Sequence, residues 1–286
     1  MVSDTSRPYR THNLLVTNLL LGISALYFLV PIWWLVVTVT REPGRTFSGN
    51  GLWFDGFGLF ENIALVFAEK DGIFGVWLLN SVLYALVAGA VGTLLSALAG
   101  FALAKYRFSG REVVFGVILT AVLIPKVLFT LPLFLMFNAL GMLDGPLNPL
   151  TFLLPSIVSP FGVYLARVFA AQSVPDEVIE AARLDGAGEF KIFFRMSMPM
   201  MSPALVTIFL FQFVEVWNNF LLPSQLITNR WFQTVSVGLV TWSDSNGQVP
   251  AGTVITAAFI STIPLVVAFL CLQRFWRAGL TAGAVK

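Results

Sequence analysis

Glu180-Ala-Ala-Arg-Leu-Asp-Gly-Ala-Gly188 lies near the centre of a polar stretch, about Ser173 to Met198, between two long apolar segments. This stretch contains eight charged residues. A loop that only connects two membrane helices needs few polar residues, so a polar stretch of this size requires another explanation. Its pattern predicts two short helices with a bend at Gly186 and Gly188, which is the geometry of a docking surface.

The composition of the flanking sequence predicts a membrane protein. Of the 286 residues 57% are hydrophobic and 11% are charged, and the charged share is about half that of a soluble domain. A run of about 20 apolar residues crosses the hydrocarbon core. We therefore expect an all-α polytopic protein in which residues 1–286 form a single transmembrane domain. Its six predicted spans are 14–38, 76–104, 113–137, 150–171, 202–222 and 252–273.

The placement of lysine and arginine predicts the orientation, because cytoplasmic loops of membrane proteins are rich in these residues. With six spans both termini share a side, and that side has twelve of the sixteen relevant basic residues. Both termini and the polar stretch are therefore expected in the cytoplasm. The twelve are Arg7, Arg10, Lys105, Arg107, Arg111, Arg167, Arg183, Lys191, Arg195, Arg274, Arg277 and Lys286, and the other side has Arg41, Arg45, Lys70 and Arg230.

Several functions are not favoured by the composition. The net charge of +2 follows from the topology and does not indicate a nucleic-acid partner. The first apolar segment is too long for a signal-peptide core and lacks a clear cleavage site. One cysteine, Cys271, and one histidine, His12, leave no zinc-type cluster, so no metal or cofactor is expected.

The second span has small residues at every fourth position: Ala88, Gly92, Ser96 and Gly100. Residues four apart share a helix face, and small residues there allow another helix to approach closely. The stripe predicts a tight interface, either within this chain or with a partner. Prolines inside four spans, among them Pro125, predict locally bent helices around an interior path.

Two charged residues lie within predicted spans: Lys126, directly after Pro125, and Glu215. A charge at the membrane centre costs about 2.5–3.5 kcal/mol on insertion scales, so such residues usually face the bundle interior or water. We expect both to line a translocation path, where they could lie near enough to attract each other. The alternative is that Lys126 caps carbonyls freed by Pro125, while Glu215 only holds helices together.

Trp217, Asn218 and Asn219 follow Glu215 closely. Amides supply hydrogen-bond donors and acceptors, and an indole face can stack on a sugar ring. This run therefore suits a hydroxyl-rich solute. The competing interpretation is a row of helix-to-helix hydrogen bonds with an interfacial tryptophan.

Within the polar stretch, Ser173 and Pro175 predict a helix start, since serine caps free amides and proline suits a first turn. Glu180 and Arg183 have the spacing for an ion pair, and Gly186 ends the helix. The small side chains of Ala181 and Ala182 leave a low surface for a partner. The alternative is a helix pair that rests on lipid headgroups.

The polar stretch resembles the EAA loop of ABC-importer permeases. The resemblance lies in Glu180-Ala-Ala, Gly186 and the sequence Met196-Ser-Met-Pro199, with methionine at two positions that are usually isoleucine and leucine. Further stretches are similar to the carbohydrate-uptake branch, the maltose-permease-G-like subunits. They are Asn80-Ser81, Ala99–Lys105 with Arg107, Phe108, Gly110 and Arg111, Trp217–Phe220 and Gly279–Lys286.

This resemblance implies a type I ABC-importer permease of a bacterial or archaeal plasma membrane. It implies as partners a homologous permease subunit, two cytoplasmic ATP-binding subunits and an extracytoplasmic substrate-binding protein. It also implies that residues 173–199 form the coupling loop and that the Thr281–Lys286 tail reaches the ATPases. The implied ATPase-coupling residues are Glu180, Ala181, Ala182, Asp185, Gly186 and Gly188.

The implied activity is import of a sugar, polyol or glycoside by alternating access, driven by ATP that another polypeptide hydrolyses. The chain has no glycine-rich loop ending in Gly-Lys-Ser or Gly-Lys-Thr, so it is not expected to hydrolyse ATP itself. One alternative is a gradient-driven transporter, which usually has an internal repeat and several midplane ion ligands. Another is an intramembrane enzyme using a serine with Lys126.

Overall fold

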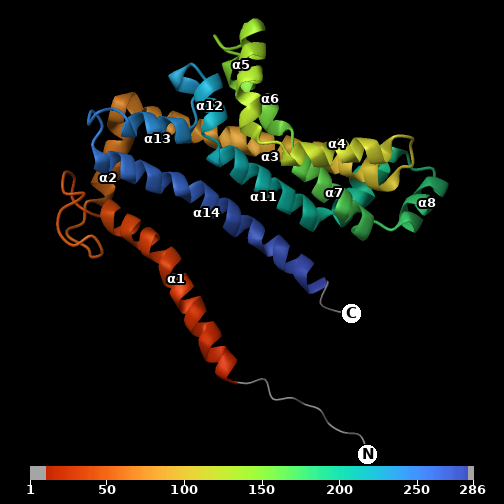
Figure 1. Ribbon diagram of the computed structural model, residues 1–286, viewed down its shortest axis with the longest axis horizontal. Helices are drawn as coiled ribbons and strands as arrows, with labels where there is room; N and C mark the ends of the chain where they lie inside the picture. The colour runs from red at the N-terminus through yellow and green to blue at the C-terminus, as the bar shows by residue number, and fades with distance from the viewer. Residues whose placement is uncertain (1–10, 283–286) are drawn as a thin grey trace, which may run out of the picture.

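The computed structural model describes residues 11–282, and every regular element among them is helical (Figure 1). Three helices are about 30 residues long: α1 (Thr11–Val39), α3 (Ile73–Lys105) and α14 (Ala251–Ala282). The shorter helices are α2 (Leu59–Ala68), α4 (Arg111–Leu123), α5 (Thr130–Ala139), α6 (Asn148–Ile157), α7 (Pro160–Ser173), α8 (Asp176–Leu184), α9 (Glu189–Ile192), α10 (Met198–Met200), α11 (Ser202–Asn218), α12 (Leu221–Leu226) and α13 (Val235–Ser243). Single turns are η1 (Glu69–Gly72), η2 (Lys126–Phe129), the π-helical η3 (Phe193–Ser197) and η4 (Arg230–Phe232).

Among the described residues four helical segments are long and apolar enough to cross a membrane, and six if two bent pairs each count as one span. The expectation of an all-α polytopic protein is confirmed. The third span is not one straight helix over 113–137, because α4 and the following η2–α5 segment meet at 97°. Pro125 lies at this bend, where its missing N–H prevents α4 from continuing.

The centre of the bundle is α3, which packs chiefly against α7 and α11. A Cβ added at Gly100 would lie 2.5 Å from the Cβ of Ala166 in α7, and one added at Gly92 would lie 2.7 Å from the carbonyl oxygen of Ile157. The predicted small-residue interface is therefore present. Its neighbours belong to this chain, since Ile157 is in α6 and Ala166 is in α7. Only glycine allows these backbones to approach so closely.

A cluster of aromatic side chains joins α3 to α13 at the end of α3 where Ile73 lies. Trp77 and Trp242 have ring centroids 5.2 Å apart, and the Trp77 indole donates a hydrogen bond of 2.7 Å to the carbonyl of Arg230. Gly238 of α13 packs directly on the Trp77 ring. This cluster anchors the loops at the end of the molecule opposite α8 (Figure 1).

Basic residues of the described chain lie at both ends of the bundle. Lys105 and Arg183 lie at the end that has α8, whereas Arg41 and Arg230 lie at the end that has α2 and α13 (Figure 1). This placement fits the predicted topology, and the cytoplasmic position of the termini stays a prediction. Arg7, Arg10 and Gly283–Lys286, which belong to that prediction, lie outside the described residues.

Helix α1 diverges from the rest of the bundle, and α14 is the spanning helix that it contacts (Figure 1). Only 6% of its most apolar window is buried, and large side chains such as Leu26, Tyr27 and Phe28 are more than 60% exposed. An apolar surface of this extent is stable only in contact with lipid or protein.

The loop that follows α1 is folded around Arg41. The buried Arg41 guanidinium donates hydrogen bonds to the carbonyls of Thr46, Ser48 and Asn50.

Candidate coupling surface and translocation pocket

Three interruptions of the helices meet at one pocket of about 400 Å³. One is the break between α4 and η2 at Ile124, the second is the break between α6 and α7 at Val158, and the third follows α11 at Asn219. Pro160, which begins α7, also lines the pocket. Irregular backbone at membrane depth is tolerated where protein or a water-filled cavity satisfies it, so the convergence of three breaks is typical of a transport site.

Lys126 and Glu215 both line this pocket and form an ion pair, in which the ammonium of Lys126 donates to the carboxylate of Glu215. The sequence left open whether they are neighbours, since 89 residues separate them. The alternative in which Lys126 caps carbonyls freed by Pro125 is not supported, because the Lys126 ammonium pairs with Glu215 instead. The pair joins η2 to α11, and its role in the path stays a prediction.

The three residues after Glu215 lie in different environments. Trp217 is 4% exposed and stacks on Phe213 with ring centroids 6.0 Å apart, so the suggestion that its indole meets a solute is wrong. Asn219 lines the pocket, and its side-chain oxygen accepts a hydrogen bond of 3.2 Å from the amide of Leu222. Asn218 is exposed but is not among the pocket-lining residues. Only Asn219 of the two amides is thus placed beside Lys126 and Glu215.

The polar stretch does contain two short helices, but their boundaries differ from the prediction at the start. Helix α7 continues through Ser173, so this serine does not cap α8, and Pro175 occupies the position before α8. Asp176 then begins α8 and forms an ion pair of 2.7 Å with Lys105 at the end of α3. The Lys105 side chain is only 7% exposed, so the carboxylate neutralises a nearly buried charge.

The bend after α8 is made by Gly186, as the sequence predicted. Its φ of +75° lies in the left-handed region, which glycine adopts without the Cβ penalty of other residues. The amide of Ala187 donates to the carbonyl of Ala182, and the amide of Gly186 donates to that of Arg183. This is a Schellman ending. Gly188 has a φ of −72° and does not need to be glycine for conformational reasons.

Arg183 pairs with Glu189 and not with Glu180, so the predicted pair within α8 is wrong. The guanidinium of Arg183 donates from Nε to Oε1 of Glu189 at 2.8 Å and from Nη2 to Oε2 at 3.2 Å. The bend at Gly186 brings the two side chains together across the turn. Glu180 is left exposed, without an ion pair among the described residues.

The exposed face of the coupling loop contains most of the residues expected to contact ATPases. Glu180, Ala181, Asp185, Gly186 and Gly188 are exposed. Ala182 is 4% exposed and packs with Ile179 and Ile192 against the bundle, so its role is to seat α8.

Two exposed apolar side chains on this face were not recognised from the sequence. Leu184 is 90% exposed and Phe190 is 78% exposed. Both flank the Gly186 bend, outside the predicted spans. Their position beside a glycine turn was the available signal, but amphipathic periodicity alone assigns such residues to a buried face.

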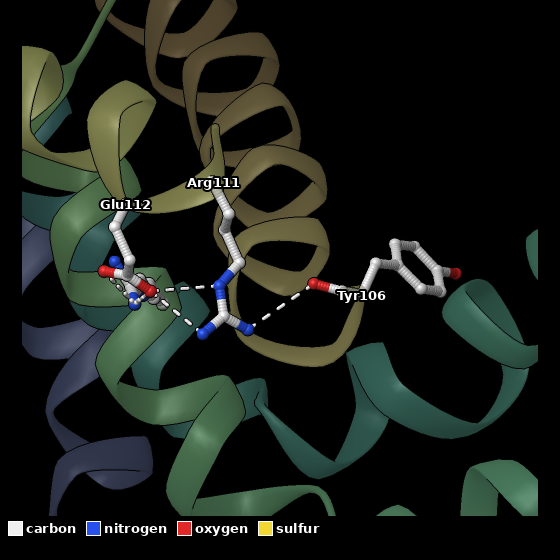
Figure 2. Close-up of polar contacts among 4 residues, drawn as sticks. Tyr106, Arg111 and Glu112 are labelled. Carbon is white, nitrogen blue, oxygen red and sulfur yellow. Dashed lines mark hydrogen bonds and ion pairs between the residues drawn. The ribbon is translucent and has the colours of Figure 1, made fainter. Parts of the chain in front are cut away.

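Tyr106, the residue that follows α3, connects the loop to the bundle. Its hydroxyl donates to Oε2 of Glu189 at 2.6 Å. On its other side its backbone carbonyl faces Arg111, at 3.5 Å from Nη1 (Figure 2). Arg111 in turn pairs with Glu112 at 2.9 Å, and Arg167 of α7 bonds the same carboxylate. Figure 2 shows the Tyr106 ring pointing away from Arg111.

The contacts of the loop shift the pKa values of several ionisable groups. Burial, with the nearby Glu189 carboxylate, raises the pKa of Tyr106 to about 12. Hydrogen bonds from Arg183 and Tyr106 lower the pKa of Glu189. The hydrogen bond from Lys105 lowers the pKa of Asp176. The raised pKa keeps the Tyr106 hydroxyl protonated and able to donate, and the lowered pKa values keep Glu189 and Asp176 ionised as acceptors. Among the described residues no group of three potential metal ligands occurs.

Residues 92–280 match the family described as the binding-protein-dependent transport system inner membrane component. The chain belongs to this family. The family membership identifies it as a permease subunit of an ABC importer, a membrane component rather than an enzyme, and as a multi-pass inner-membrane protein. The expectation of an ABC-importer permease, drawn from the EAA-like loop, is thereby confirmed.

Curated relatives include the arabinooligosaccharide transport system permease protein AraQ of Halalkalibacterium halodurans. It is 33% identical, over 88% of this chain and 89% of the relative. The lactose transport system permease protein LacG of Rhizobium radiobacter is also 33% identical, over 93% and 94%. The solved structure of a bacterial ABC transporter involved in import of the acidic polysaccharide alginate has a chain with a TM-score of 0.80 and 23% identity, covering 95% of this chain and all of that chain.

Proposed function

We propose that this chain, with a homologous permease subunit, two cytoplasmic ATP-binding subunits and an extracytoplasmic substrate-binding protein, imports a neutral saccharide into a bacterial or archaeal cell. The observation that supports this most directly is the exposed face around Glu180, Leu184 and Gly186. It combines a charged residue, an apolar side chain and a smooth glycine turn outside the spans. Such a face suits insertion into a cleft of a protein partner.

The pocket favours a neutral solute. Lys126 and Glu215 neutralise each other, so the lining has no net charge to attract a phosphate or a carboxylate. The remaining wall is largely apolar, with Ser156 and Asn219 as polar groups. Hydroxyl groups can bond to an ammonium, a carboxylate or an amide. The named substrates of the curated relatives, arabinooligosaccharides and lactose, are neutral sugars.

The mechanism that fits this arrangement is alternating access driven from the coupling loop. Closure of the ATP-binding subunits would displace α8, and the tightly packed α3, α7 and α11 would follow as one body. The pocket lies where α4, α6 and α11 are interrupted. Rotation of the rigid helices would change access to it there, at the points where the helices are already broken.

The remaining surface fits lipid and a second permease subunit. Only 6% of the most apolar window of α1 is buried, and α4 has no buried residue. Both helices are apolar, and each needs a covering that the described chain does not supply. Neither surface has the basic stripe that nucleic-acid binding requires.

The test is solute uptake by the reconstituted transporter, assembled from this chain and its co-purifying partners in proteoliposomes. Lactose and arabinotriose are offered as neutral solutes, with a hexose phosphate and an alginate trimer as anionic ones. The proposal expects ATP-dependent uptake of a neutral sugar that an ionophore does not abolish. Uptake that needs an ion gradient and no ATP would instead support a gradient-driven transporter. Uptake of the anionic solutes alone would contradict the neutral-saccharide proposal.

A further inference from the structure

The coupling loop is attached to α3 by two polar bridges that the sequence pattern did not indicate. Lys105, the last residue of α3, pairs with Asp176 at the start of α8. The hydroxyl of Tyr106, the next residue, donates a hydrogen bond to Glu189 at the start of α9. Two successive residues, the last of α3 and the one that follows it, thus bind both helices of the loop.

The second bridge also fixes the bend. Glu189 accepts hydrogen bonds from Arg183 and from Tyr106, so a single carboxylate joins the end of α8, the start of α9 and the end of α3. The Arg183 guanidinium lies 5.8 Å from the centroid of the Tyr106 ring. The ring itself packs edge-on against Phe101 inside the bundle. Tyr106 therefore has an apolar contact with the core and a polar contact with the loop.

The bridge continues from Tyr106 into two further helices. Arg111 contacts the Tyr106 carbonyl and binds Glu112 at the start of α4 (Figure 2). Arg167 of α7 binds the same carboxylate. Because the guanidinium of Arg167 also lies 3.7 Å above the Phe115 ring, its position is fixed on two sides. The chain of contacts runs without interruption from the bend of the coupling loop to α3, α4 and α7.

We propose that Tyr106 is a positioning residue for coupling: its hydroxyl holds Glu189 and the Gly186 bend against α3, so that displacement of the loop moves α3. Lys105 performs the same task for the start of α8. This inference rests on the proposed function, in which the loop receives the movement of an ATPase. Without the bridges α8 could tilt on its small buried contacts, and ATP would be hydrolysed without moving the spans.

The decisive variant is Tyr106→Phe, which removes one hydroxyl and retains the ring and its contact with Phe101. In proteoliposomes containing the assembled transporter we expect ATP hydrolysis to persist, while solute transported per ATP falls by about threefold to tenfold, as for the net loss of one solvent-exposed hydrogen bond. Glu189→Gln should give a fall in the same direction. A structural defect alone would instead lower both rates together through loss of assembled complex.

Tyr164→Phe in α7 is the matched control, since the Tyr164 hydroxyl has no hydrogen bond recorded among the described residues and its ring contacts are with Phe115 and Phe161. It should leave the ratio of transport to hydrolysis unchanged. An unchanged ratio in Tyr106→Phe would overturn the inference, provided that the wild type transports with ATP. A wild type that binds no ATPase would count against the proposed function itself, so the two failures are distinguishable.

Discussion

Replacement of Gly100 by alanine should separate α3 from α7 at their closest crossing. The added methyl would lie 2.5 Å from the Cβ of Ala166, 2.6 Å from the backbone nitrogen of Arg167 and 2.7 Å from the carbonyl carbon of Ala166. Two of these three atoms belong to backbone and cannot rotate away. Since carbon atoms pack best at about 3.5–4.0 Å, the helices must move apart by roughly 1 Å.

The energetic consequence has two opposing parts. Overpacking of this kind costs about 1–3 kcal/mol, whereas alanine is favoured over glycine inside a helix by about 1 kcal/mol. Gly116 of α4 separates the two, because a Cβ there meets nothing within 4 Å. Gly116→Ala should therefore leave the free energy of unfolding unchanged or raise it. The free energy of unfolding of Gly100→Ala should be lower than that of Gly116→Ala by the overpacking cost.

The assay is thermal unfolding of the purified chain in detergent, read for both variants against wild type. We expect a lower Tm for Gly100→Ala than for Gly116→Ala, by about 2–4 °C for each kcal/mol. The assembled transporter with Gly100→Ala should also transport more slowly, since the displaced end of α3 has Lys105 and Tyr106. Equal Tm values for the two variants would show that α3 and α7 do not cross as described.

Three further predictions concern the pocket and the loop. Lys126→Met and Glu215→Gln should each lower uptake, because each leaves a charge in the span without its partner at a cost of about 2.5–3.5 kcal/mol, and the double variant should be less impaired than the sum of the two; additive effects would argue against a direct pair. Because the pKa of Glu189 is lowered in the folded chain, its contribution to stability should be present above the ordinary carboxyl value of 4.5 and be lost as pH falls below it; a Glu189→Gln variant with the same acid limb as wild type would contradict this. Gly186→Ala, at a φ of +75°, should cost about 1–2 kcal/mol and speed hydrogen exchange in α8, whereas Gly188→Ala should not.

Much of the fold was predictable because apolar runs and small-residue spacing are local properties of the sequence. The Gly92 and Gly100 stripe predicted a close helix contact, and the structure adds that α6, α7 and α11 supply it. The 97° bend near Pro125 was predictable in place but not in size. A proline removes one hydrogen bond, and the angle that results depends on the helices packed around it.

The candidate site was less predictable, because its contacts join residues far apart in the sequence. The types of Lys126 and Glu215 indicated function, but their pairing depends on where α4 breaks. Arg183 could pair with Glu180 one helical turn away or with Glu189 across the bend. The Schellman ending at Gly186 brings Glu189 to Arg183, and these two pair. The chemistry of Trp217 allowed either contact with a solute or a place between helices, and its packing on Phe213 decides against the solute.

The central claim is that the loop around Glu180 and Gly186 docks an ATPase, and a pull-down from the native membrane tests it most directly. The Glu180→Arg/Gly186→Arg variant is compared with wild type and with Glu61→Arg/Gly247→Arg. The control makes the same two changes at the opposite end of the bundle, where Gly247 also has a positive φ and open space. The account predicts that an ATPase co-purifies with wild type and with the control but not with the coupling-loop variant. Co-purification that is equal in all three, or absent from wild type, would contradict it.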